Sequence, residues 1–447
     1  MPFWSVARVH SRDFTRVRKL PFSRLMFLCL NYVTRPMFTE AVQFFRNVIG
    51  VDEFVTQQSL SEARQKVKYE AFQEIFESIL GQALTVEDFE LFHGYRLLAI
   101  DGTTIQLTNV PEIQEAFGDK TPAQGEVFAR MSMILDVKNG CIMDGELAPF
   151  HIGERQMAIQ GVRRLSKWAG KCLYLMDRGY WSPELYETIL ESGSSFLARV
   201  PNGVTTEVRS GAEQISIQHQ GKNYCLQCKR ILLSSGEVET LVTNLPEEEL
   251  SDKELEEVYH LRWGIETKYR ELKSYLKIDT LPGKTYQTVM QDFYATLTVS
   301  NMAAFAGCIA GAEITEKQAG KGNQYAYGPN KSVILAVLKD HLIAAIALDD
   351  PVERLWHFDT IQRPCPLVRL NDRGVLCTKA GQNSWKRKSE GNVPHCNMLQ
   401  FWWALIVHID DFVPPDLPCT FGPLNLLALP PPLTPCSLAA CEVAKGR

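Results

Sequence analysis

The sequence predicts an α/β fold: a mixed sheet flanked by helices, with an all-β insertion and a helical domain at the N-terminus. The first observation is that residues 20–90 show an apolar period typical of helices and no strand pattern. The second is that short apolar strands alternate with helical segments from residue 97 onward. With 447 residues and 45% hydrophobic content, the chain is long enough for two to four domains.

Residues 1–92 are predicted to form the helical domain, which we expect to bind DNA. The chain has a formal net charge of -5, but its first 24 residues carry six basic residues and one acid. The segment 56–68 offers Ser59 or Ser61 as a helix N-cap, followed by basic residues expected at exposed positions. These are Arg64, Lys66 and Lys68. A plain surface helix has the same pattern, so this segment alone leaves both interpretations open.

The sheet is predicted to begin with an apolar strand over 97–102 that delivers an acid, Asp101, at its end. Alternating apolar and polar residues follow at 104–107. The next two strand-like runs meet at Asn139-Gly140, and such a pair is a strong hairpin signal because both residue types tolerate a positive φ in a tight turn. The sheet therefore starts with an acid-bearing strand and a hairpin.

A second acid is placed in the same way. The apolar run 172–177 ends on Asp177, between helical segments at 153–168 and 183–192, and another strand follows at 195–200. In α/β folds, residues at the carboxyl ends of strands lie where active sites form. Both acids are therefore candidate active-site residues.

A long helix is predicted over 250–277, after the all-β insertion at 203–247, with Ser251 as its N-cap and Glu254 completing a capping box. On an ideal helix, four polar residues fall within roughly 60° of one another across four turns. These residues are Tyr259, Arg262, Glu266 and Lys273. Apolar residues occupy the adjoining sector, so the polar line is expected at the edge of a buried face. Taken alone, such a line is more typical of a solvated helix face.

The combination of Asp101, Asp177 and Glu266 changes this interpretation. Three carboxylates can hold two divalent metal ions about 4 Å apart, and Mg²⁺ prefers oxygen ligands. One ion would activate an attacking water or 3′-hydroxyl, and the other would stabilise the leaving oxygen. The three remaining members of the polar line would receive phosphate oxygens. These residue types therefore indicate phosphodiester chemistry.

The order strand, hairpin, helix, strand, helix, strand, insertion, helix matches the ribonuclease-H-like fold. The sequence resembles the bacterial insertion-sequence transposases of the DDE class, in particular the IS-four group, whose signature is Y-x-x-R-x-x-x-E-x-x-x-x-x-x-K. Residues 259–273 read YHLRWGIETKYRELK and keep every spacing of this signature. The first two acids also stand in family settings, IDGT at 100–103 and MDRGY at 176–180.

The resemblance implies a transposase that cleaves and joins DNA at the ends of an insertion sequence by metal-dependent hydrolysis and transesterification. The implied catalytic residues, which would bind two Mg²⁺ ions or Mn²⁺ in their place, are Asp101, Asp177 and Glu266. The implied DNA-binding residues are Tyr259, Arg262 and Lys273. The implied partners are double-stranded DNA, as transposon ends and target, and a second copy of the chain in a homodimer formed on DNA.

Two other functions stay open at this point. A metal-dependent nuclease on the same fold would use the same carboxylates for hydrolysis alone, and a non-catalytic DNA-binding remnant or regulator would occupy transposon ends without cutting them. Neither of the longest apolar stretches reaches the roughly 18 residues needed to span a bilayer. The cysteines show no disulfide-like spacing. We therefore expect a cytoplasmic, nucleoid-associated bacterial protein that does not enter the membrane.

The resemblance also divides the chain. The ribonuclease-H-like catalytic domain is expected over 93–310, interrupted by the insertion, and a helical segment over 311–365. Residues 366–447 depart from the family, whose members tend to end in a basic segment. We hypothesise that a change of reading frame produced this tail. Translating the encoding DNA in the other two frames tests the hypothesis, which fails if neither frame gives a basic, family-like ending.

Overall fold

The structure is a computed structural model of the chain. It describes residues 3–16, 18–31, 37–47, 55–85, 89–118, 126–168, 170–232, 238–318, 326–347, 357, 360–361 and 367–370. Apart from 367–370, the tail that we attribute to a change of reading frame lies outside the described residues.

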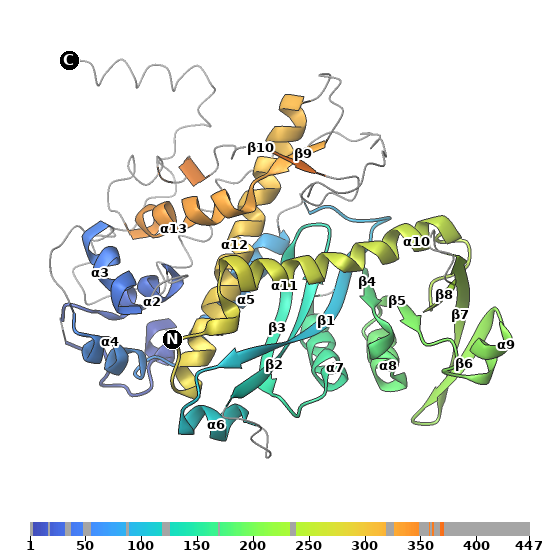
Figure 1. Ribbon diagram of the computed structural model, residues 1–447, viewed down its shortest axis with the longest axis horizontal. Coiled ribbons are helices and arrows are strands. Elements are labelled where there is room, and N and C mark those ends of the chain that lie inside the picture. Colours follow the sequence, from blue (N-terminus) through green and yellow to red (C-terminus); the bar gives the residue numbers. More distant parts are fainter. Residues whose placement is uncertain are drawn as a thin grey trace.

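A mixed sheet forms the centre of the molecule (Figure 1). Among the described residues it contains eight strands in the order β3-β2-β1-β4-β5-β8-β7-β6. The strands are β1 (Arg96–Leu107), β2 (Val127–Asp136), β3 (Cys141–Pro149), β4 (Cys172–Met176), β5 (Ser195–Val200), β6 (Gln214–His219), β7 (Lys222–Leu232) and β8 (Val238–Thr243). The first three strands are antiparallel neighbours, while β1, β4 and β5 run parallel. This is the strand arrangement of a ribonuclease-H-like sheet, so the predicted fold class is confirmed.

Helices cover both faces of this sheet (Figure 1). They are α1 (Phe3–Ala7), α2 (Phe22–Asn31), α3 (Met37–Asn47), α4 (Gln57–Arg64), α5 (Glu70–Thr85), α6 (Pro111–Phe117), α7 (Glu154–Leu165), α8 (Pro183–Glu191), α9 (Thr206–Ser210), α10 (Asp252–His260), α11 (Gly264–Tyr275), α12 (Tyr286–Gln318) and α13 (Lys331–Ala347). Alternate residues of β1 point to opposite faces: Leu98 and Ile100 enter the core formed with α7 and α8, whereas Leu97 and Ala99 enter the core formed with α11 and α12. The strand therefore has a hydrophobic layer on each side.

The hairpin predicted at Asn139-Gly140 is present between β2 and β3, with Gly140 at a φ of 70°. On the outer edge of β3, the Asn301 side chain of α12 replaces a strand neighbour. Its Oδ1 accepts from Ile142 N at 2.7 Å and its Nδ2 donates to Ile142 O at 2.8 Å. A buried amide thus satisfies the edge strand and fixes α12 against the sheet.

The insertion differs from its prediction. It is not all-β, because it includes the short helix α9, which Thr205 caps at its start and Gly211, with a φ of 81°, ends. These local caps outweigh the strand-like pattern around them. Its strands also do not form a separate unit: β8 pairs antiparallel with β5, so β8, β7 and β6 extend the central sheet.

The helix α12 passes through the core of the molecule. Within the described residues, its segment Tyr286–Ala312 is the one helix long and apolar enough to cross a membrane by length and composition. However, 67% of its most apolar window is buried inside the protein. Contacts with β3, α2 and α5 account for this burial.

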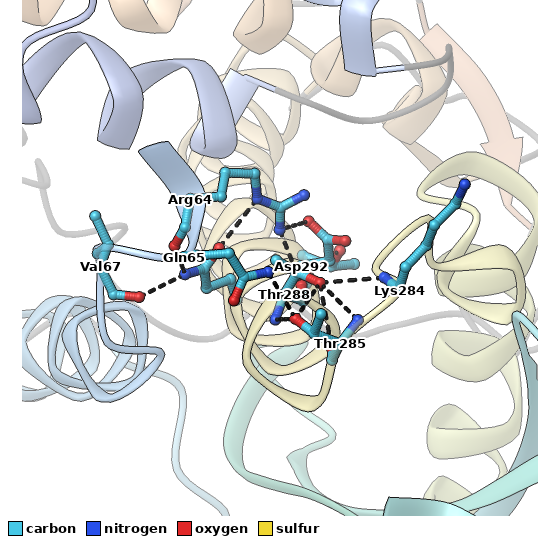
Figure 2. Close-up of polar contacts among 9 residues, drawn as sticks. Arg64, Gln65, Val67, Lys284, Thr285, Thr288 and Asp292 are labelled. Atoms are coloured by element: carbon cyan, nitrogen blue, oxygen red, sulfur yellow. Dashed lines mark hydrogen bonds and ion pairs between the residues drawn. The ribbon is translucent and has the colours of Figure 1, made fainter. Parts of the chain in front are cut away.

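A buried polar network joins α4 to α12 (Figure 2). Arg64 was predicted to be exposed, and that prediction is wrong, because Arg64 is only 6% exposed. Its Nη2 donates to Asp292 Oδ1 at 2.6 Å and to Thr288 O at 2.9 Å. Its Nε donates to Gln291 Oε1 at 3.0 Å. The side chain that we expected to be exposed therefore holds two parts of the protein together.

The network also fixes the backbone where α4 ends. Gln291 Nε2 donates to Arg64 O at 2.9 Å and to Val67 O at 2.7 Å. The start of α4 also differs from its prediction, because Thr56 is the N-cap and accepts from Ser59 N at 3.1 Å. Ser59 itself lies inside the helix, because α4 begins at Gln57, before either of the two serines that we expected to cap it.

The Arg64–Asp292 pair yields a stability prediction. Arg64→Ala is expected to lower the free energy of unfolding by about 3–5 kcal/mol, because it leaves a carboxylate that is 3% exposed without its cation. Arg163→Ala is the control, since the Arg163–Glu184 pair is half exposed and spans 3.9 Å. That variant is expected to lose less than about 1 kcal/mol. Equal losses in urea unfolding would contradict the role of the network.

Candidate active site

Strand β1 continues beyond the first acid, so the prediction that the strand ends there is wrong. It pairs with β2 along its length, from Leu98 to Leu107, and this ladder keeps it extended. On its other side, the pairing with β4 ends at Ile100 opposite Met176. Asp101 therefore lies inside β1, at the point where the neighbouring strand stops.

Asp177 follows the last residue of β4, as predicted. Because Ile100 and Met176 are in register, Asp101 and Asp177 each stand one residue beyond the same pair. Asp177 is the N-cap of a 3₁₀ helix, η2 (Arg178–Tyr180), and its side chain accepts from Arg178 N. This cap turns the chain away from the sheet and leaves the carboxylate at the strand end.

The signature segment is not the single regular helix that the sequence predicts. The capping box at Ser251 and Glu254 is confirmed, but a 3₁₀ turn, η3 (Leu261–Trp263), separates α10 from α11. The two helices stay nearly in line across the sheet (Figure 1). A 3₁₀ turn is tighter than an α-helical one and rotates the residues that follow it. The four signature residues therefore do not share one exposed line.

The burial of the signature residues shows this directly. Tyr259 is 4% exposed and Arg262 is 5% exposed, whereas the Glu266 side chain is 36% exposed. Arg262 Nη2 donates to Glu266 Oε1 at 3.2 Å. Trp263, beside this arginine, is 55% exposed and does not belong to the core.

Arg262 lies among the three candidate acids. Burial lowers the pKa of its guanidinium, but Tyr259, Asp177, Glu266 and Asp101 outweigh burial and raise the pKa overall. Its guanidinium carbon also lies 5.9 Å from the centre of the Tyr259 ring. The structure thus brings the predicted arginine and the predicted acids together at the end of β4.

Helix α11 is attached to β1 at two points. Lys273 Nζ donates to Thr103 Oγ1 at 2.9 Å and to Thr104 O at 3.2 Å. The Tyr269 hydroxyl donates to Asp101 O at 2.7 Å, where β4 no longer supplies a partner. Sequence analysis missed this tyrosine, although its position three residues after Glu266 places it on the same side of the helix.

Asp101 carries an unfavourable negative charge. Burial raises its pKa to about 6; the Gly102 backbone and Arg262 lower it, while Glu154 and Glu266 raise it further. Burial therefore makes the ionised form of Asp101 unfavourable, and the two neighbouring glutamates add to this effect.

Glu154 is an acid near the site that sequence analysis missed. It is the first residue of α7, and its Oε1 lies 3.1 Å from Arg130 Nη1. A Cβ on Gly102 would lie 2.8 Å from the Glu154 side chain, so the glycine permits this close approach. Its position as the first helical residue after the hairpin is the signal that could have identified it.

The donor types fit a divalent cation by their chemistry, because carboxylate oxygens are ligands that Mg²⁺ prefers. Their positions do not form a closed ligand set: within the described part of the chain, no three His, Cys, Asp or Glu side chains are close enough to hold one ion. Arg262 pairs with Glu266 at 3.2 Å, and the charges of Asp101 and Asp177 also act on its guanidinium. The residue types thus match a metal site, whereas Glu266 is engaged in an ion pair with Arg262.

Comparisons with known proteins show what the chain is similar to. The family described as Transposase DDE domain matches residues 92–302, a range that includes all the predicted site residues. The chain is 23% identical over 283 residues to the Transposase InsG for insertion sequence element IS4 of Escherichia coli, covering 57% of this chain and 62% of that protein. It therefore spans less than two thirds of this relative.

A second relative is the Putative transposase for insertion sequence element IS4SA of Synechocystis. It is 22% identical over 255 residues, covering 55% of this chain and 70% of the relative. Among solved structures, the piggyBac transposase synaptic complex with hairpin DNA aligns with a TM-score of 0.37 and 10% identity over 78% of this chain and 87% of the other. That likeness is too low to carry an argument. The matched domain and the two relatives make this chain similar to the IS4-family DDE transposases.

Proposed function

We propose that this protein cleaves and joins DNA at the ends of an insertion sequence. The observation that carries the proposal is that Asp101 and Asp177 each stand one residue beyond the Ile100–Met176 pair and that their charges, with that of Glu266, act on Arg262. Acids of this kind suit metal-dependent phosphodiester chemistry, and the cation among them suits a phosphate.

In this proposal Asp101, Asp177 and Glu266 hold two Mg²⁺ ions, which Mn²⁺ can replace. When bound, such ions lower the pKa of an attacking hydroxyl and stabilise the charge on the leaving oxygen. The raised pKa of Asp101 supports this assignment, since a cation would relieve the negative charge that burial leaves uncompensated.

Arg262 and Lys273 bind phosphate oxygens in this proposal. Arg262 Nε is buried and has no hydrogen-bond partner among the described residues, so a phosphate oxygen would satisfy it. Lys273 uses two of its three donors on β1, which leaves one for DNA. Tyr259 and Arg262 are buried to a similar extent, and the Tyr259 ring beside the guanidinium supports a role for this tyrosine in orienting Arg262.

The proposed partners are double-stranded DNA and a second copy of the chain, joined when two transposon ends are brought together. The exposed Lys68, the half-buried Lys66 and the basic residues before residue 24 supply positive charge to the N-terminal helices. Backbone pairing of Val9 with Lys66 and of Lys68 with Ala7 brings these two basic segments side by side. This shared charge supports a DNA contact by the N-terminal domain.

Substitution of the signature glutamate tests the proposed function. Glu266→Gln is expected to lower Mg²⁺-dependent cleavage of DNA carrying the element's end by at least about 100-fold, because an amide is a weak metal ligand. Glu256→Gln is the matched control: its side chain is 37% exposed, close to the 36% of Glu266, and it also has an i, i+4 partner, His260. The control should cleave normally. Equal cleavage by wild type and Glu266→Gln would refute the mechanism, and cleavage without strand joining would favour the nuclease.

The charge on Asp101 gives a second prediction, for metal-free protein. Folding raises the pKa of Asp101 from 3.8 to about 6, so ionisation destabilises the folded state. The penalty is absent below about pH 4, grows between about pH 4 and pH 6, and is complete above about pH 6. Asp101→Asn should therefore raise the free energy of unfolding by about 3 kcal/mol at pH 7.5 in EDTA.

Urea unfolding across this pH range measures the effect. The difference between Asp101→Asn and wild type should disappear near pH 4, and added Mg²⁺ should stabilise the wild type more than the variant. A variant that is less stable than the wild type at pH 7.5 in EDTA would show that this carboxylate is not under electrostatic strain.

A further inference from the structure

Tyr180 has a buried hydroxyl for which the protein supplies no partner. It is the last residue of η2, the 3₁₀ helix that Asp177 caps, and it is 2% exposed. Among the described residues, its hydroxyl makes no hydrogen bond. Buried polar groups are hydrogen-bonded in most proteins, because leaving one unpaired costs free energy. An exception beside a candidate active site requires an explanation.

Tyr180 lies in the turn that Asp177 caps, and the acids of the site are close enough to act on its hydroxyl. Burial raises the pKa of Tyr180 well above its ordinary value, and the negative charges of Asp101, Glu154 and Asp177 add to this effect, with Arg130 opposing them. The phenol therefore stays protonated and can donate. Tyr269, another buried tyrosine beside Asp101, already donates to the Asp101 backbone. Its hydroxyl therefore has a hydrogen-bond partner, whereas the Tyr180 hydroxyl has none among the described residues.

The surroundings hold Tyr180 in this position. Its backbone N donates to Asp177 O at 3.0 Å, within the same turn that sets the acid. Arg155 Nε, from the first turn of α7, donates to Gly179 O at 2.7 Å and fixes the turn from the other side. The ring is packed in the core between the sheet and α7 and α8. The donor is thus preorganised, and a partner must come to it.

We propose that the Tyr180 hydroxyl donates a hydrogen bond to an oxygen that enters the active site with the substrate. That oxygen belongs either to the DNA phosphate at the cleaved bond or to a water carried in with it. A neutral donor suits this place, because it accepts an anionic oxygen beside carboxylates without adding another charge that must be buried. The inference rests on the proposed function of the same site.

The test compares Tyr180→Phe with Tyr186→Phe. Tyr186, on α8, is also fully buried, and its hydroxyl likewise lacks a partner among the described residues. The charged groups that act on it are Arg155 and Tyr259 rather than the acids of the site. Each variant removes one oxygen and no hydrogen bond, so both should keep the melting temperature of the full-length protein or raise it.

The probe is a duplex of the DNA that flanks the gene, cut in a single turnover with Mg²⁺. At saturating DNA, we expect Tyr180→Phe to cut roughly 10- to 100-fold more slowly than wild type and Tyr186→Phe to stay within about twofold. A Tyr180→Phe rate equal to that of wild type overturns the proposal. An equal loss in both variants also overturns it, because the effect would then come from packing.

A phosphorothioate at the cleaved bond identifies the source of the oxygen. If the partner is a phosphate oxygen, the sulfur should slow wild type more than Tyr180→Phe, since the two changes remove the same contact. If the partner is water, the sulfur should slow cleavage by wild type and by Tyr180→Phe to the same extent. Tyr180→Phe should still cut more slowly than wild type.

The Glu266→Gln variant separates failure of this inference from failure of the proposed function. If Glu266→Gln is inactive and Tyr180→Phe is fully active, the function stands and the inference fails. If wild type does not cut, the affinity of each protein for the same duplex is measured in Ca²⁺. Weaker binding by Tyr180→Phe but not by Tyr186→Phe supports a hydrogen bond from Tyr180 to the DNA. Equal binding by wild type and Tyr180→Phe overturns the proposal.

Discussion

Strand β1 has hydrogen-bonded neighbours on both sides up to Ile100 and a neighbour on one side after it. The position of the candidate active site depends on this loss of the β4 neighbour after Ile100. Because β4 stops at Met176 while β2 continues, β1 stays paired with β2 through Asp101 but has no β4 partner there. The turn after β4 places Asp177 at this strand end, and the Tyr269 hydroxyl donates to the Asp101 backbone carbonyl.

The second consequence of this geometry is electrostatic. Burial raises the pKa of Asp101 to about 6, the Gly102 backbone and Arg262 offset part of this rise, and Glu154 and Glu266 add to it. Such an arrangement lowers the stability of the folded protein, and proteins retain strain of this kind at functional sites. The unpaired Nε of Arg262 and the unpaired hydroxyl of Tyr180 add to the same pattern, because both donors are buried beside the acids.

The N-terminal helices are tied to this arrangement through α12. Arg64 joins α4 to Asp292, and Asn301 on the same long helix holds the edge strand β3. A rigid helix therefore connects the N-terminal helices with the sheet that carries the acids. Buried ion pairs contribute less to stability than to defining one arrangement of the parts they join, and we interpret the Arg64 network in this way.

Much of the fold could be predicted from the sequence, because strand runs, the Asn139-Gly140 turn and the Ser251 capping box are set by neighbouring residues. The spacing from Tyr259 to Lys273 also indicated the resemblance to the transposases, since it is a property of the chain itself. Only the tertiary structure decided which polar side chains are buried. Arg64 and its partner Asp292 are 228 residues apart, and no local pattern shows that one will find the other. The same holds for Tyr180 and Glu154, whose neighbours at the site come from distant strands and helices. Short-range hydrogen bonding fixes the elements, whereas the environment of a charge depends on the packing of the whole chain.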